Sequence, residues 1–313
     1  MSRLVRLERC RRAARMVGGA AMLLGVVGCT TVADDFVATK PETIQAPQSA
    51  AVQTAVLDLA DQALHEGRVS DARALLNRAL LNSGGTPRAR LIAAEVKLAS
   101  GAYRSAAAAF NDLAATPDMA ARALQGEGIA LALADHDPES GYASLSAAVA
   151  QDPTLWRAWN ALGYYHDSRA EWARASESYA RALAVVPNSA MILNNRGFSM
   201  LMQGRIEEAL ANLGEALHHD PALRPARENL RLALAWDGQY ALALAGTEDN
   251  GLARALNNVG YVALLRGDHD KSEALLLQAI EVDPAFNTIA ARNLAYLRHL
   301  RESKRIEDSL PPR

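Results

Sequence analysis

Residues 153–187 read PTLWRAWNALGYYHDSRAEWARASESYARALAVVP and contain one complete helix-turn-helix unit. Trp159 and Gly163 lie about one helical turn apart, so they share a face of a first helix. Ala175 and Tyr179 have the same spacing and would line one face of a second helix. Gly163 and Ala175 are small, which would let the two helices approach closely.

The unit recurs along the chain. Gly163 has a counterpart 34 residues later at Gly197 and another 63 residues further on at Gly260. Proline, which cannot continue a helix, repeats in the same register at Pro153, Pro187, Pro221 and Pro284. The turn before the second helix is marked by Gly67, Gly101, Gly204, Gly238 and Gly267, and by His136 and Ala170 in two units. One helix pair cannot bury its apolar face alone, so the copies must stack.

This 34-residue pattern resembles the tetratricopeptide repeat, or TPR. The resemblance implies an all-α solenoid over residues 53–304, a right-handed superhelix of about seven helix-turn-helix repeats. Unit six, 224–252, is five residues short, which predicts a truncated second helix. A last helix is expected from residue 287, where Arg292, Arg298, Arg301 and Lys304 suit a polar cap. Residues 305–313 would form a disordered tail.

The N-terminus has the features of an exported lipoprotein. Residues 1–28 contain six Arg and one Glu, followed by an apolar run at 16–28 that is shorter than the roughly 20 residues needed to span a bilayer. This indicates a secretory signal peptide. Val26-Val27-Gly28-Cys29 resembles the bacterial lipobox, in which the Cys is acylated and becomes the new N-terminus; an ordinary membrane anchor or a chance Cys is the alternative. Residues 29–52 would then be the acylated Cys29 and a flexible tether.

Composition and motifs disfavour several functions. Loss of the signal peptide with Cys10 and acylation of Cys29 would leave no thiol for a disulfide or zinc cluster. Residues 1–28 carry +5 of the formal net charge of −2, so the mature chain carries −7, which disfavours nucleic acid as a partner. There is no GxSxG, P-loop, HExxH or dinucleotide motif, so we expect no enzymatic activity, cofactor or metal. We interpret His218-His219-Asp220 as the end of a helix, where His meets exposed carbonyls, rather than as a metal site.

Two sets of first-helix residues are candidates for binding a peptide. Asparagines occupy the fifth position of their units at Asn160, Asn194 and Asn257, where they would either hold the backbone of an extended peptide or bond neighbouring repeats to each other. Apolar residues at the ninth and thirteenth positions would either line a trough for an amphipathic helix of a partner or pack between repeats; these are Tyr164, Phe198, Met202, Leu232, Trp236, Tyr261 and Leu265.

The chain also resembles the TadD lipoproteins of tight-adherence (Flp) pilus assembly. The resemblance is sharpest in NNRGFSMLMQGRIEEALANLGEAL (194–217), RENLRLALAWDGQY (227–240), ALNNVGYVALLRGD (255–268) and RNLAY (292–296). It implies an outer-membrane protein that faces the periplasm, is held by its N-terminal lipid, and helps the pilus secretin to localise or assemble. A pilotin-like lipoprotein of type IV pili, or an adaptor for enzymes of the cell wall or of envelope polymers, is the alternative.

Overall fold

The computed structural model describes residues 50–80, 85–134, 137–283 and 287–309. Every regular element in these ranges is a helix, and the predicted all-α TPR solenoid is the observed fold. None of the described helices is both long enough and apolar enough to cross a membrane. The predicted signal peptide, Cys29 and the tether as far as residue 49 lie outside the described residues.

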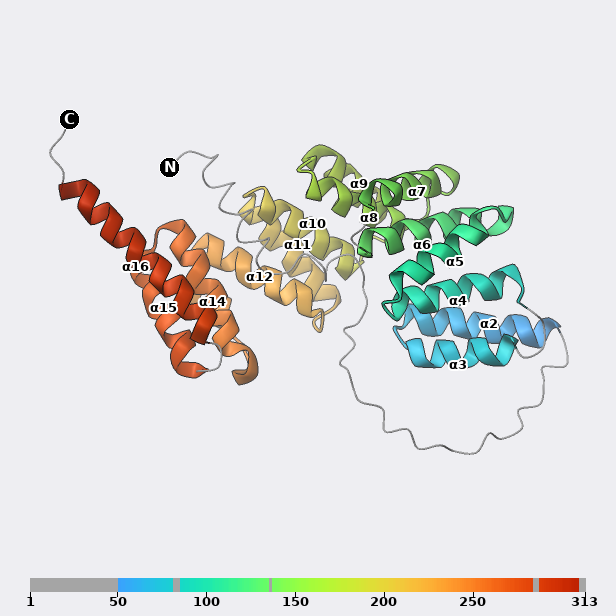
Figure 1. Ribbon diagram of the computed structural model, residues 1–313, viewed down its shortest axis with the longest axis horizontal. Coiled ribbons are helices and arrows are strands. Elements are labelled where there is room, and N and C mark those ends of the chain that lie inside the picture. The colour runs from blue at the N-terminus through green and yellow to red at the C-terminus, as the bar shows by residue number, and fades with distance from the viewer. Residues whose placement is uncertain (1–49, 81–84, 135–136, 284–286, 310–313) are drawn as a thin grey trace. The chain divides into compact units, whose positions relative to one another are not determined.

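The chain divides into two compact bodies, whose described parts fall within residues 50–187 and 188–309. We call them the N-terminal body and the C-terminal body. In each, successive helix pairs pack against one another in chain order (Figure 1). The N-terminal body contains α2 (Ala50–His65), α3 (Val69–Leu80), α4 (Pro87–Ala99), α5 (Tyr103–Ala114), the short 3-10 helix η1 (Pro117–Met119), α6 (Ala120–Leu133), α7 (Pro138–Gln151), α8 (Trp156–Ser168) and α9 (Trp172–Val185). The C-terminal body contains α10 (Ala190–Met202), α11 (Ile206–His219), α12 (Arg224–Asp237), α13 (Tyr240–Leu244), α14 (Asp249–Arg266), α15 (His269–Val282) and α16 (Asn287–Ser309).

All seven predicted helix pairs are present, from α2 and α3 to α14 and α15, followed by α16. The last helix is longer than predicted, because it runs to Ser309 instead of ending near residue 304. Arg305 and Glu307 are good helix formers, and the first proline after the added residues is Pro311. The predicted tail therefore shrinks to residues 310–313, which lie outside the described residues.

Glycine in the first helix sets how closely the second helix can pack. A Cβ atom added to Gly163 would lie 2.5 Å from Cε1 of Tyr179, and one added to Gly197 would lie 2.8 Å from Cγ of Leu213. The sequence suggested that Ala175 allows this approach. Ala175 is fully buried, but the atoms nearest Gly163 belong to the Tyr179 ring, one turn further along α9. Gly163 is needed to make room for this large aromatic side chain.

The turns within the repeats use left-handed backbone conformations. The five predicted turn glycines have φ between +74° and +93°, a region that side chains with a Cβ rarely adopt: Gly67, Gly101, Gly204, Gly238 and Gly267. In repeat four, formed by α8 and α9, the same place is held by Ala170, with φ of +59°. Ala170 is the one residue other than glycine with a positive φ in the described part of the chain. Its backbone therefore stores strain that the five glycine turns avoid. The turn predicted at His136 lies outside the described residues.

Repeat six is truncated as predicted, and Arg231 explains how the truncation is accommodated. Its second helix, α13, has only 5 residues. Arg231 stands where other repeats have the close-contact glycine, and its guanidinium group reaches the end of α13. Nε donates to the carbonyl oxygen of Ala243 over 2.9 Å, Nη2 to Oγ1 of Thr247 over 3.0 Å, and Nη1 to Oε2 of Glu228 over 2.8 Å. The arginine thus satisfies backbone and side-chain groups where a longer second helix would otherwise pack.

Candidate protein-binding face

The three candidate asparagines are buried, and two of them connect neighbouring first helices. In the C-terminal body, Nδ2 of Asn229 on α12 donates to Oδ1 of Asn194 on α10 over 2.8 Å. Nδ2 of Asn293 on α16 donates in the same way to Oδ1 of Asn257 on α14, also over 2.8 Å. The exposed fractions of Asn194 and Asn257 are 2% and 5%, and that of Asn160 on α8 is 2%. Asn194 and Asn257 therefore join repeats, as in the second of the two interpretations.

Two of the candidate apolar residues belong to the core. Leu232 and Trp236 on α12 have exposed fractions of 4% and 6%. They lie in one buried cluster with Leu201 of α10 and Leu256 of α14, the helices on either side of α12. An open trough cannot include them, so the prediction that they line one is wrong for these two residues. Their role is packing between repeats.

The other candidates keep part of their surface exposed. Phe198 on α10, and Tyr261 and Leu265 on α14, pack against the core of the C-terminal body and are partly exposed. Met202 on α10 is also partly exposed. Tyr164 on α8 is also partly buried, but it belongs to the N-terminal body. In the C-terminal body, the predicted apolar residues that can still contact a partner therefore lie on α10 and α14.

The structure adds α16 to this surface. The Asn257–Asn293 hydrogen bond fixes how α14 and α16 face each other. At about 100° per residue, Tyr261 lies about 40° from Asn257 on α14, and Tyr296 lies about 60° from Asn293 in the opposite sense on α16. The first helices α14 and α16 run in the same direction, and their asparagines face each other. Rotations of opposite sense away from this contact therefore place Tyr261 and Tyr296 on the same side of the helix pair. Tyr296 is 49% exposed.

Sequence reasoning missed Tyr296 and its neighbour Ile289, which is 50% exposed about two turns earlier on the same face. The spacing of the tyrosines in the sequence could have revealed Tyr296. Tyr296 follows Tyr261 by 35 residues, close to the repeat length of 34. The opposite face of α16 packs on α14 and α15 through three buried side chains, Ala290, Leu294 and Leu297.

Charge is distributed unequally between the two kinds of helix in the C-terminal body. The first helices α10, α12, α14 and α16 contain eleven Lys or Arg and six Asp or Glu, a net charge of +5. The second helices α11, α13 and α15 contain one Lys and six Asp or Glu, a net charge of −5. In the N-terminal body the corresponding values are 0 and +1. The first helices of the C-terminal body thus carry a net positive charge, part of which, on Arg298 and Arg301 of α16, pairs with Glu273 and Asp270 of α15.

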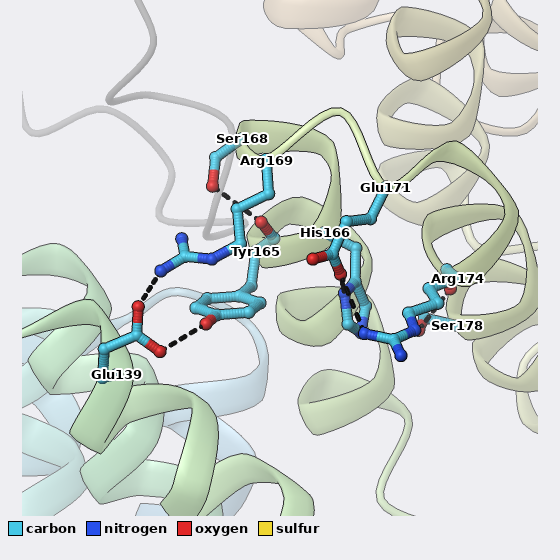
Figure 2. Close-up of polar contacts among 8 residues, drawn as sticks. All are labelled: Glu139, Tyr165, His166, Ser168, Arg169, Glu171, Arg174 and Ser178. Carbon is cyan, nitrogen blue, oxygen red and sulfur yellow. Dashed lines mark hydrogen bonds and ion pairs between the residues drawn. The ribbon is translucent and has the colours of Figure 1, made fainter.

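A polar and aromatic cluster in the N-terminal body joins repeat three to repeat four (Figure 2). The Tyr165 hydroxyl on α8 donates to Oε2 of Glu139 on α7 over 2.7 Å. Arg169 pairs with the same carboxylate and lies 4.1 Å from the centroid of the Tyr165 ring. The ring of Tyr142 on α7 stacks on the Tyr165 ring, with centroids 4.5 Å apart. Burial raises the pKa of the Tyr165 hydroxyl above its ordinary value.

The second half of the cluster closes the turn between α8 and α9. Nδ1 of the buried His166 lies 2.7 Å from Oε2 of Glu171, and Arg174 Nη1 lies 3.3 Å from the same oxygen (Figure 2). The hydrogen bond from His166, with a smaller contribution from Arg174, holds the pKa of the Glu171 carboxyl below its ordinary value. Because each of these groups already has a protein partner, the cluster serves helix packing.

The histidine pair predicted at a helix end is found there. His218 and His219 form the last turn of α11, and their rings are 5.4 Å apart in an edge-on arrangement. Among the described residues, no group of three or more His, Cys, Asp or Glu side chains is arranged to hold a metal ion. The placement fits an interaction with the exposed carbonyls of α11.

Comparison with known proteins supports the fold. No family model matches the chain, and no curated protein matches it. The chain is similar to the crystal structure of TTC0263, a thermophilic TPR protein in Thermus thermophilus, with 23% identity, a TM-score of 0.50, and coverage of 61% of this chain and 98% of that one. It is similar to a chain of the APC/C hetero-tetramer Cut9-Hcn1, with 15% identity, a TM-score of 0.57, and coverage of 79% and 51%. PilW, a type IV pilus biogenesis factor, matches with 16% identity, coverage of 80% and 99%, and a TM-score of 0.49. The first two likenesses show a TPR fold.

Proposed function

We propose that this chain is a non-enzymatic scaffold that binds a protein partner at the first helices of its C-terminal body. One observation carries the proposal: large apolar side chains at equal repeat positions on α10 and α14 stay partly exposed, namely Phe198, Met202, Tyr261 and Leu265. Exposed aromatic and aliphatic side chains that gather on one surface are typical of protein-binding sites. The bonded asparagines beneath them hold neighbouring helices in register, so the surface is formed before a partner arrives.

The place of action that we propose is the periplasmic side of the outer membrane, and the partner is the secretin of a tight-adherence (Flp) pilus or another component of its assembly. The lipobox-like sequence that ends at Cys29 and the resemblance to TadD lipoproteins support this assignment. The scaffold would hold the secretin near the membrane while it localises or assembles. Several acyl chains on Cys29 would supply durable anchoring, since a single chain gives only marginal membrane binding.

Site-specific crosslinking would test the binding surface. A photo-crosslinking amino acid at Phe198 or Tyr261, in the full-length acylated protein in its own cells, should capture the secretin. The matched control is Leu277, which is 45% exposed on the second helix α15. Crosslinks from Leu277 as strong as those from Phe198 and Tyr261, or no capture of a protein at all, would contradict the proposed surface.

Anchoring has a separate test. Cys29→Ser should block acylation and processing, so the precursor should stay uncleaved and should not reach the outer membrane. Palmitate labelling and membrane fractionation measure the two effects. The proposal for the anchor is wrong if the variant is labelled and fractionates like the wild-type protein.

A further inference from the structure

The surface that α14 and α16 share is both apolar and basic. Its apolar part is formed by Tyr261, Ile289 and Tyr296, and the last two are about half exposed. Arg254 lies three residues before Asn257 on the Tyr261 side of α14, and Arg292 lies one residue before Asn293 on the Tyr296 side of α16. We call these five residues, Arg254, Tyr261, Ile289, Arg292 and Tyr296, the α14–α16 patch.

Both arginines of the patch are available to a ligand. The Arg254 side chain is 46% exposed, and its nearest acidic partner, Glu228, is 3.7 Å away. Glu228 is at the same time held by Arg231 over 2.8 Å. Arg292 is exposed, and no ion pair joins it to another described residue. Two cations on adjacent helices therefore flank the exposed aromatic and aliphatic groups.

Acidic residues are absent from this side of the two helices as far as their side chains are described. The exposed or partly exposed residues that continue the two stripes are Asn258 and Leu265 on α14 and His299 on α16. Helical geometry turns Asp249 of α14 and Glu302 of α16 away from the patch, since each lies about 110° or more from its centre. The local charge is thus positive, in agreement with the net charge of +5 on the first helices of this body.

We propose that the α14–α16 patch binds an acidic, amphipathic segment of the partner protein, with its carboxylates on Arg254 and Arg292 and its apolar side chains on Tyr261, Ile289 and Tyr296. This inference rests on the proposed scaffold function and adds the chemistry of the bound segment. Arginine and tyrosine are among the side chains that most often contribute strongly to such contacts. The excess of positive charge selects an acidic segment over a basic one of equal hydrophobicity.

Fluorescence anisotropy with the full-length protein in detergent would test the proposal. The probe is a labelled synthetic peptide of about four helical turns that carries Leu and Trp on one helical face and Glu on the other. A second peptide carries Lys in place of each Glu. We expect the Glu peptide to bind at least about tenfold more tightly than the Lys peptide, and its affinity to fall as salt is added.

The variants separate the patch from the rest of α16. Arg292→Glu and Tyr296→Ser should each weaken binding of the Glu peptide about tenfold or more. Arg298→Glu is the matched control, because Arg298 is 62% exposed on the other side of α16, near Glu273. It should change the affinity less than about twofold. Equal binding of the two peptides, or an equal effect of Arg298→Glu, would overturn the proposal.

Two further measurements would detect a different ligand at the α14–α16 patch. Analytical ultracentrifugation that finds self-association abolished by Arg292→Glu, with no peptide binding, would assign the patch to a second copy of the chain and overturn the proposal. Binding to phosphatidylglycerol vesicles that depends on Arg292, again without peptide binding, would assign it to lipid with the same consequence. If crosslinking from Phe198 to the secretin persists in Arg292→Glu while no peptide binds, only this inference fails. If the wild-type protein captures no partner but binds the Glu peptide through the patch, the proposed function fails instead.

Discussion

Arg231→Ala should weaken the C-terminal body far more than loss of an ordinary surface arginine. The Arg231 side chain is only 13% exposed and bonds three groups: the Ala243 carbonyl, the Thr247 hydroxyl and the Glu228 carboxylate. Alanine removes all three hydrogen bonds and leaves the space beside α13 empty. The change therefore combines an unsatisfied backbone group with a packing defect.

The magnitude follows from these contacts. A hydrogen bond that involves a charged group contributes about 1.5–3 kcal/mol, and a buried carbonyl left without a donor costs about 1–3 kcal/mol. Ala243 is 2% exposed, so water reaches its carbonyl only if α13 moves. The pair with Glu228 adds less than about 1 kcal/mol, because the glutamate is 29% exposed and remains near Arg254. Since these effects overlap, we expect a total loss of about 3 kcal/mol.

Hydrogen exchange on the full-length protein localises the effect. A loss of about 3 kcal/mol corresponds to roughly a hundredfold fall in protection, which we expect for α12, α13 and α14. Amides of α4 and α5, in the other body, should be unaffected, because a solenoid transmits damage mainly to neighbouring repeats. The control is Arg254→Ala, which removes a half-exposed arginine near the same Glu228 and should cost about 0–1 kcal/mol. Equal effects of the two substitutions would refute the structural role of Arg231.

Three further substitutions test other features of the fold. Ala170→Gly should raise stability by about 0.5–1 kcal/mol in urea unfolding, because relief of the left-handed strain exceeds the entropy that glycine adds to the unfolded chain. Gly163→Ala should destabilise repeat four by about 1–3 kcal/mol, because the new Cβ would lie 2.5 Å from the Tyr179 ring; unchanged hydrogen exchange in α8 and α9 would contradict the close contact. Burial, and then the hydrogen bond to Asp268, raise the pKa of Tyr240 to about 12. Stability from its neutral hydroxyl should be fully present below about pH 10 and be lost as the pH rises through 12, and Tyr240→Phe should remove this dependence in alkaline unfolding.

The repeat architecture could be predicted because its constraints are local. Gly163, Gly197 and Gly260 mark a close helix contact, and the turn glycines mark a left-handed backbone, so their spacing alone counts the repeats. The five missing residues before 253 likewise predict a short second helix, which the structure shows as α13. These features depend on residues close in sequence or on one helix pair.

The exposure of the candidate site could not be predicted, because it depends on neighbouring repeats. Phe198 and Leu232 occupy the same repeat position, yet only Phe198 stays partly exposed. The break in the glycine series at Arg231 was a sign that repeat six packs differently, but the sequence does not say which side chains its short α13 leaves buried. From the arginines of α16 we predicted a polar cap, whereas Tyr296 beside them extends the row that contains Tyr261.

Arg231 links the truncated repeat to the α14–α16 patch. Its bonds hold the end of α13, and α14 begins only five residues after α13 ends, so the position of α14 depends on this contact. Arg231 also binds Glu228, whose other oxygen lies 3.7 Å from Arg254. Without Arg231, Glu228 would be free to pair fully with Arg254 and compete with an acidic ligand for it. Arg231, which packs beside the short α13, therefore also keeps Arg254 of the patch available to an acidic ligand.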